Sequence, residues 1–149
     1  MNKTEVLKFN DQVIEAWNKR DAEKFINLYD ENATWKINGG IETYRGKKEI
    51  KEYFNRWKNA FPDLHLTIRS STVDNDAISV EFQFSGTQNG TLHLKNDMPE
   101  IAPTHRKANT YGSYTTRLKN GKVIETNLYT DRLALVEQLG VESELMHHA

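Results

Sequence analysis

The chain has 149 residues, which is the size of one domain with a core of its own, so a single domain covering residues 1–149 is expected. Its 20 basic and 21 acidic residues give a formal net charge of -1, which offers no basic field for nucleic-acid phosphates. It contains no cysteine, which excludes disulfides, thiolate nucleophiles and Cys-based zinc sites.

The first predicted element is an amphipathic helix between residues 4 and 19. Its apolar residues recur three or four positions apart, with charged residues between them. These residues are Val6, Phe9, Val13, Ile14 and Trp17. This start is amphipathic and lacks the charged region and continuous apolar core typical of a signal peptide, and no later segment is apolar for long enough to cross a bilayer. A cytoplasmic protein with no membrane partner is therefore expected.

The next predicted elements are two further helices with a strand between them. Asp21 is suited to cap a short helix that carries Phe25, Leu28 and Tyr29 on its buried face. A short strand is expected over residues 33–37, followed by a loop over residues 38–40. The third helix is expected over residues 47–60, where Ile50, Phe54 and Trp57 share a face and Pro62 ends the helix.

The second half of the chain predicts antiparallel strands and one closing helix. Apolar residues alternate with polar ones over residues 64–69 and 78–84, and these two strands are joined through residues 74–76. Asn120-Gly121 predicts a tight type I′ hairpin between residues 111–118 and 122–129. Asp131 opens the last helix, and Gly140 suits the left-handed position after its end.

Several stretches of the sequence are similar to motifs of one known family. They are the opening WNKRDAEKFINLYDENATWKI, AFPDLHLTI after the third helix, SGTQNG, APTHRKANTYGSY, and NGKVIETNLYTDRLALVEQLG at the end. Together they resemble the SnoaL-like polyketide cyclases of the NTF2-like superfamily. The resemblance implies an α+β cone, with a curved sheet, three N-terminal helices on its concave side and a short C-terminal helix. This order of elements agrees with an α+β architecture.

In that family, the aspartate of the last motif acts as a general acid/base, and the matching residue here is Asp131. The family reaction removes a proton next to a carbonyl, and the resulting enolate closes a ring by aldol attack. The resemblance therefore implies a cofactor-free cyclase or isomerase that acts on a small carbonyl compound. The local sequence also supports a purely structural reading, because aspartate is among the best N-cap residues and can satisfy the first amides of the last helix.

An apolar pocket around Asp131 is expected to hold a hydrophobic small molecule. Its predicted lining is aromatic, although each of these residues could equally be plain core. The predicted lining residues are Trp17, Trp35, Phe54, Trp57, Phe82 and Phe84. Burial in such a pocket would raise the pKa of Asp131, whereas the helix amides would lower it. Our expectation is a buried acid with a raised pKa.

The sequence departs from the family pattern at three positions of the predicted site. Gln88 replaces a histidine, Asn127 replaces a tryptophan and His105 replaces a glycine. Gln88 and Asn127 can both donate hydrogen bonds to an enolate oxygen, so both are expected at the substrate. The ketosteroid isomerase site is absent, because Val13 and Ile37 stand where its tyrosine and aspartate would be.

Other kinds of chemistry find no support in the sequence. The five histidines form no recognised metal-ligand spacing, and the sequence has no nucleophile elbow, Walker loop or dinucleotide glycine loop. No metal and no cofactor are therefore expected. Two alternatives to the enzyme stay open, a non-catalytic ligand-binding protein and a structural dimerisation domain. A cavity of roughly 300 Å³ or more would favour a ligand site, and a filled core would favour the structural alternative.

Two further expectations concern surfaces. The outer face of the sheet would be left uncovered, so a homodimer through this face is expected. Residues 92–101 form a polar segment that is longer than the family pattern has at this place. This segment is expected either to cover the mouth of the pocket as a lid or to be an inert surface loop.

Overall fold

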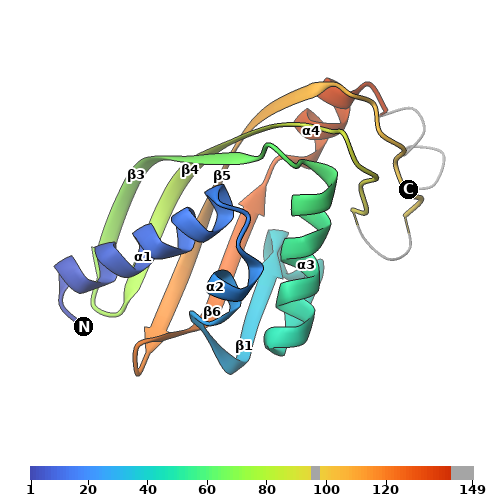
Figure 1. Ribbon diagram of the computed structural model, residues 1–149. Helices are drawn as coiled ribbons and strands as arrows, with labels where there is room; N and C mark the ends of the chain where they lie inside the picture. Colours follow the sequence, from blue (N-terminus) through green and yellow to red (C-terminus); the bar gives the residue numbers. More distant parts are fainter. Residues whose placement is uncertain (95–97, 142–149) are drawn as a thin grey trace.

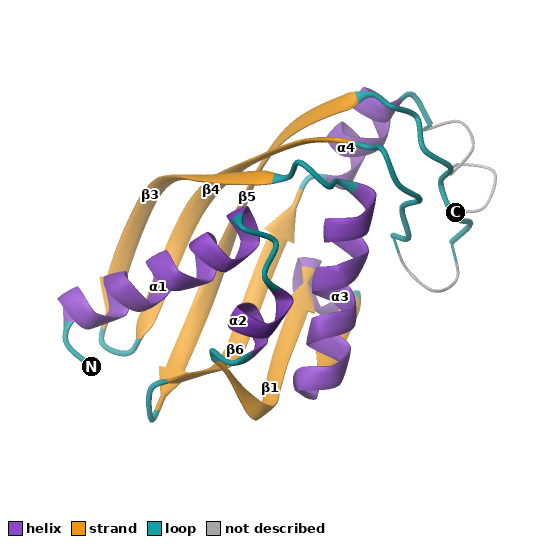
Figure 2. Cartoon of the chain, viewed as in Figure 1, coloured by secondary structure: helices purple, strands orange, loops and turns teal. Residues whose placement is uncertain are grey.

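The computed structural model describes residues 1–94 and 98–141. The described residues form four α-helices, one short 3-10 helix and six strands (Figures 1 and 2). The helices are α1 (Lys3–Asn18), α2 (Ala22–Ile26), α3 (Gly46–Ala60) and α4 (Arg132–Leu139), with the 3-10 helix η1 (Asn38–Gly40). The strands are β1 (Tyr29–Ile37), β2 (Glu42–Arg45), β3 (His65–Asp74), β4 (Ala77–Thr87), β5 (Lys107–Lys119) and β6 (Lys122–Thr130).

The six strands form one curved sheet in the order β2-β1-β6-β5-β4-β3. β1 and β6 run parallel, and all other neighbouring strands are antiparallel. Helices α1, α2 and α3 cover one face of this sheet, as Figure 1 shows. The predicted α+β cone is therefore confirmed.

The N-terminal helices begin where the sequence predicted them. Asn2 caps α1 and forms a capping box with Glu5, because each side chain accepts a hydrogen bond from the other residue's amide. Asp21 accepts the Lys24 amide at 3.0 Å and so starts α2, as expected. The predicted apolar face of α1 is buried against the sheet.

The hairpin and the closing helix of the C-terminal half are also confirmed. Asn120 and Gly121 have φ angles of 53° and 75°, the positive values that the two central residues of a type I′ turn require. Asp131 is the N-cap of α4, and Gly140 ends the helix with a φ of 74°.

The structure corrects the region between residues 29 and 45. Tyr29 was expected on the second helix but is the first residue of β1, four positions before the predicted strand. Strand β2 was not predicted at all, because its four residues are too short for an alternation to be visible. These two strands form the edge of the sheet beside α3, and both contribute side chains to the site described below.

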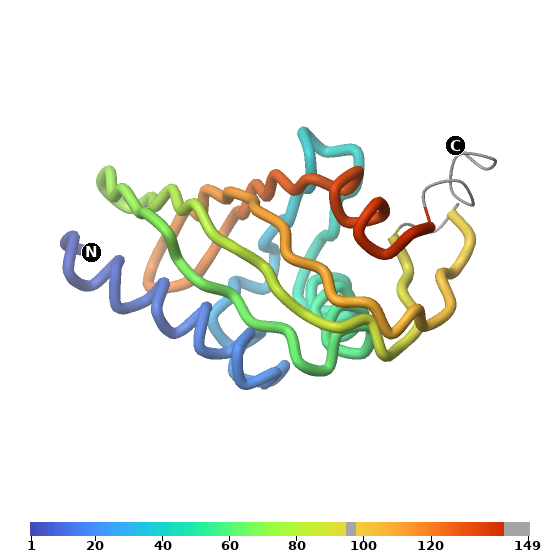
Figure 3. The backbone as a smooth tube through the Cα atoms, turned by 90° about the horizontal axis from the view of Figure 1, so that it is seen from above, coloured from blue at the N-terminus to red at the C-terminus, as the bar shows by residue number. Residues whose placement is uncertain are grey.

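The described residues of the segment over residues 92–101 do not line the pocket. Its ends pair through two backbone hydrogen bonds of 2.9 Å between Leu92 and Ile101, and both side chains are buried. Figure 3, seen from above, shows this yellow segment at the α4 end of the molecule, far from the start of α1. Residues 95–97 are outside the described residues, and none of the other residues of the segment lines the cavity. The expectation of a lid at the pocket is therefore wrong for the described part of the segment.

Candidate functional site

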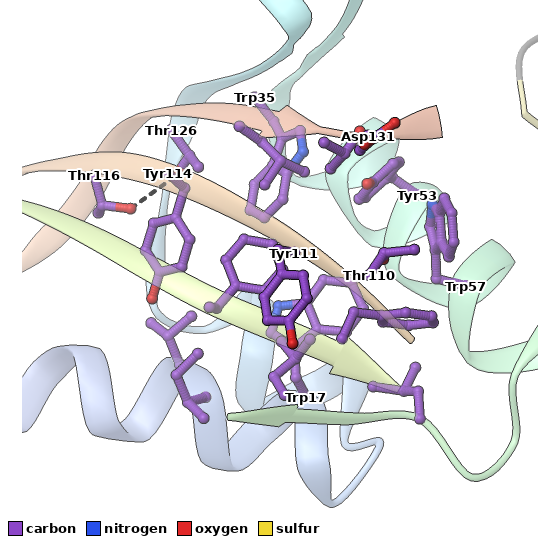
Figure 4. Close-up of a pocket in the computed structure, with 18 of the residues that line it drawn as sticks. Trp17, Trp35, Tyr53, Trp57, Thr110, Tyr111, Tyr114, Thr116, Thr126 and Asp131 are labelled. Atoms are coloured by element: carbon purple, nitrogen blue, oxygen red, sulfur yellow. Dashed lines mark hydrogen bonds between the residues drawn. The ribbon is translucent and has the colours of Figure 1, made fainter. Parts of the chain in front are cut away.

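A cavity of about 90 Å³ lies between the helices and the concave face of the sheet. Side chains of α1, α3 and the start of α4 line it, together with side chains of every strand except β2 (Figure 4). This volume is well below the roughly 300 Å³ expected for a ligand site. A bound molecule larger than a few heavy atoms would therefore require side chains at the mouth to move.

Five of the six aromatic residues predicted to line the pocket do line it, namely Trp17, Trp35, Trp57, Phe82 and Phe84. Phe54 does not line it and is fully buried in the core instead. Trp17 and Trp35 are buried with ring centroids 6.5 Å apart, and Trp57 meets Phe84 edge-to-face at 5.8 Å. These rings belong both to the hydrophobic core and to the cavity wall, so the core and pocket readings are compatible.

The α1 side of the cavity carries a buried polar contact that the sequence analysis missed. The Tyr114 hydroxyl donates a hydrogen bond of 2.5 Å to Asn10 Oδ1. Burial raises the pKa of Tyr114 well above its usual range, so this hydroxyl stays protonated. The signal was present in the sequence, because Asn10 is a polar residue next to Phe9 on the apolar face of the first helix.

The opposite end of the cavity contains a buried ion pair that was not predicted. The Arg132 guanidinium donates two hydrogen bonds of 2.8 Å to the two carboxylate oxygens of Glu42. The Glu42 side chain is 7% exposed and that of Arg132 is 22% exposed. Burial lowers the pKa of Arg132, but pairing with Glu42 outweighs this effect and the net shift is upward. Nothing in the sequence indicated this pair, because it joins residues 90 positions apart.

Tyrosine hydroxyls extend this polar end of the site. The Tyr44 hydroxyl donates to Glu42 Oε2 at 3.3 Å and accepts from Arg56 Nη1 at 3.1 Å. Burial, with Glu42 adding to the effect, raises the pKa of Tyr44 to about 12. Burial also raises the pKa of Tyr53, which lines the cavity, well above its usual range. Both hydroxyls therefore stay neutral and can act as hydrogen-bond donors.

Asp131 lies at the rim of the cavity, and the expectation that it is buried is wrong. The residue is exposed, and its Oδ1 accepts the Ala134 amide at 2.9 Å as the N-cap of α4. It lines both the cavity and a shallow outer groove formed with residues such as Glu81 and Tyr129. Its second oxygen, Oδ2, makes no hydrogen bond to any described residue. Figure 4 shows Asp131 at the same end of the pocket as Trp35 and Tyr53.

Gln88 does not face the cavity. Its side chain is fully buried, and Nε2 donates to the carbonyls of Gly90, Ile101 and Ala102 at 3.1 Å each. Its Oε1 accepts from the amide and hydroxyl of Thr104. The role predicted for Gln88 as a substrate donor is therefore wrong, because these contacts tie down the ends of the segment over residues 92–101.

Asn127 and His105 also lie away from the cavity. Strand β6 directs Thr126, Leu128 and Thr130 inward, so Asn127 projects from the outer face and donates to Glu125 at 2.6 Å. The expectation that Asn127 donates a hydrogen bond to the substrate is therefore wrong. His105 is exposed, has a φ of 58° and contacts Asn89 at 2.9 Å.

The fold and the site define a class of protein, an NTF2-like α+β cone with an apolar pocket between the helices and the sheet. The model of one family, SnoaL-like polyketide cyclase, matches residues 7–139. The chain therefore belongs to the SnoaL-like polyketide cyclase family, as its motifs indicated. No curated protein sequence matches the chain significantly.

Solved structures with low sequence identity share this fold. A putative SnoaL-like polyketide cyclase from Jannaschia sp. CCS1 has a TM-score of 0.80 at 17% identity, over 91% of this chain and 92% of that one. AclR, a putative hydroxylase from Streptomyces galilaeus, has a TM-score of 0.80 at 19% identity, over 93% and 98%. TerC, co-crystallised with polyporic acid, has a TM-score of 0.70 at 15% identity, over 91% and 98%. No helix of the described residues is long and apolar enough to cross a membrane.

Proposed function

We propose that the chain is a cofactor-free enzyme that acts on a small, mainly apolar carbonyl compound, with Asp131 as its general acid/base. One observation carries the proposal. Asp131 combines a carboxylate oxygen fixed by the Ala134 amide with a second oxygen that has no partner among the described residues, at the rim of an apolar cavity. A carboxylate that is both oriented and open to a substrate suits proton transfer.

The proposed reaction follows from these groups. Asp131 Oδ2 takes a proton from the carbon next to a substrate carbonyl, which leaves an enolate. In a cyclase, the enolate carbon then forms a bond to a second carbonyl carbon of the same molecule, and the new alkoxide takes the proton back from Asp131. In an isomerase, the proton returns to another carbon. The apolar wall excludes water from the enolate while these steps occur.

A second function, ligand binding without catalysis, is favoured by one specific observation. Asp131 is exposed and already has a structural role as the N-cap of α4, so its carboxylate has a purpose without catalysis. The cavity volume of about 90 Å³ is small for either ligand-dependent function and supports the structural alternative, a dimerisation domain with a filled core.

A thermal-shift screen followed by structure determination of a complex separates these functions. The compounds are aromatic polyketides, steroids and small β-keto esters, offered at several concentrations. For an enzyme, we expect a compound that stabilises the fold, lies in the cavity with an acidic C–H next to Asp131 and is converted on incubation. A compound that binds there unchanged would support the binding module. Failure of every class of compound to stabilise the fold would contradict both ligand-dependent functions.

We also propose a homodimer that forms through the outer face of the sheet. This face carries polar pairs such as Ser79 with Thr115 and Gln83 with Asn109, and the 51% exposed Tyr129. Exposed rings and hydrogen-bonding groups on an open sheet suit an isologous contact. Light scattering should give twice the chain mass at micromolar concentration, and a monomer would contradict the proposal.

A further inference from the structure

Two buried side-chain nitrogens lack any hydrogen-bond partner in the part of the chain that the structure describes. They are Trp35 Nε1 and Arg132 Nε, both of which are N–H donors. Buried polar groups in folded proteins are almost always paired, so an orphaned donor needs an explanation. Both residues line the same cavity, which indicates that the missing partner is something that enters it.

Tyr53 lies beside both orphaned donors. Its ring centroid is 5.4 Å from that of Trp35, and the Arg132 charge is close enough to favour the ionised form of its hydroxyl. The Trp35 N–H is also near this hydroxyl, but it does not reach it with the geometry of a hydrogen bond. Because burial keeps the Tyr53 hydroxyl protonated, it is a third donor at this end of the cavity.

The charges next to these donors determine whether they bind a charged carboxylate oxygen or a neutral carbonyl oxygen better. The Arg132 charge is already balanced by Glu42 through two hydrogen bonds of 2.8 Å, so the pair as a whole is neutral. A carboxylate brought next to it would lose its hydration and would lie near the Glu42 charge. A neutral carbonyl oxygen accepts two hydrogen bonds and is not repelled by Glu42. The local chemistry therefore favours a ketone or ester over an acid anion.

We propose that Trp35, Tyr53 and Arg132 form a subsite that binds the carbonyl oxygen of a neutral ketone or ester. The subsite rests on the proposed function, because it deepens the assignment of the cavity as a carbonyl-compound pocket. Arg132 follows Asp131 in the chain, and both line the cavity, so the subsite is at the same end as the carboxylate. Donors at this oxygen would also stabilise an enolate formed there. Gln88 and Asn127, the donors expected from the sequence, do not line the cavity.

The test is a titration of the uniformly ¹⁵N-labelled full chain with two matched probes, acetophenone and ethylbenzene. Ethylbenzene has a methylene group where acetophenone has its carbonyl, and the two molecules are otherwise the same. The three tryptophans give three indole N–H signals, which the Trp35→Phe variant assigns, and the signals of Trp17 and Trp57 serve as internal controls. We expect acetophenone to bind about 10-fold more tightly than ethylbenzene and to shift the Trp35 indole proton downfield. Benzoate, with a charged group on the same ring, should bind more weakly than acetophenone.

Two conservative variants complete the test. Trp35→Phe and Tyr53→Phe each remove one donor, and each should lower acetophenone affinity about 3- to 10-fold while ethylbenzene affinity stays within about 2-fold. Thermal unfolding checks that both variants fold. If both probes bind equally well, if benzoate binds best, or if neither variant changes the ketone preference, the subsite is refuted while the pocket stands. If neither neutral probe binds to the wild type, the subsite and the proposed function both fail.

Discussion

Replacing Glu42 by alanine should destabilise the protein by about 3 kcal/mol, because it leaves the Arg132 guanidinium in the site without its partner. The change removes two charge-assisted hydrogen bonds of 2.8 Å and the acceptor of the Tyr44 hydroxyl. Breaking a fully buried pair costs about 3–5 kcal/mol. Arg132 keeps 22% of its side chain exposed, so water solvates part of its charge and the lower end of this range applies.

Urea denaturation at neutral pH measures this loss, with thermal unfolding as a second readout. For a domain of this size, 3 kcal/mol corresponds to a decrease in Tm of roughly 6–12 °C. Glu31→Ala is the matched control, because it removes a carboxylate that is 80% exposed and 3.4 Å from Lys47. This control should lose less than about 0.5 kcal/mol.

A second comparison separates the lost pair from a general loss of packing. Replacing both partners, with Glu42→Leu and Arg132→Met together, should destabilise less than Glu42→Leu alone, because no unpaired charge remains. The reasoning would be refuted if Glu42→Ala stayed within about 1 kcal/mol of the wild type. It would also be refuted if the double variant were as unstable as the sum of the two single variants.

Three further predictions concern other side-chain hydrogen bonds. Tyr114→Phe leaves the buried Asn10 acceptor unpaired and should cost about 1–2 kcal/mol in urea denaturation, and an unchanged midpoint would contradict it. Gln88→Leu should cost about 2–3 kcal/mol and speed hydrogen exchange at the Leu92 and Ile101 amides, whereas normal exchange there would contradict its anchoring role. Burial acts to raise the pKa of Asp63, but hydrogen bonds from Thr87 lower it by more, so the net shift is downward. In one of these bonds the Thr87 amide donates to Asp63 Oδ1 at 2.7 Å. The Asp63 stabilisation is present above about pH 4 and lost as the pH falls through this lowered pKa. The stability difference between the wild type and Asp63→Asn should therefore shrink below pH 4, and a difference independent of pH would contradict this.

The fold could be predicted where local chemistry and periodicity agree. The capped helices, the turn at Asn120-Gly121 and the helix end at Gly140 each need particular residues at particular positions, and these were visible in the sequence. Strand β2 was missed because four residues on a sheet edge show no alternation. Tyr29 was misplaced because one aromatic residue fits the end of a helix as well as the start of a strand.

The site was predictable in its apolar wall and not in its polar contacts. The positions of Trp17, Trp35 and Phe82 in the cavity wall could be predicted from periodicity, because periodicity identifies the buried face of each helix and strand. A cavity in the core is lined by residues of those buried faces. Glu42 and Arg132 meet only because β2 is brought next to the start of α4, which no local pattern encodes. Asn127 was wrongly expected at the substrate because the sequence alone does not show which face of β6 lies inward. The inward residues are Thr126, Leu128 and Thr130, and the strand ends before Asp131.

The central claim is that Asp131 transfers protons in this pocket in addition to capping α4. Exchange of the α-protons of 2-tetralone for deuterium in D₂O, followed by NMR, measures this step without knowledge of the natural substrate. Asp131→Asn keeps an N-cap side chain and should change stability by only a few tenths of a kcal/mol, whereas Asp131→Ala should cost about 1 kcal/mol. The account predicts exchange above the buffer rate with the wild type and exchange at the buffer rate with the stable Asp131→Asn variant. Equal rates with the wild type and Asp131→Asn would contradict it and leave Asp131 as a helix cap.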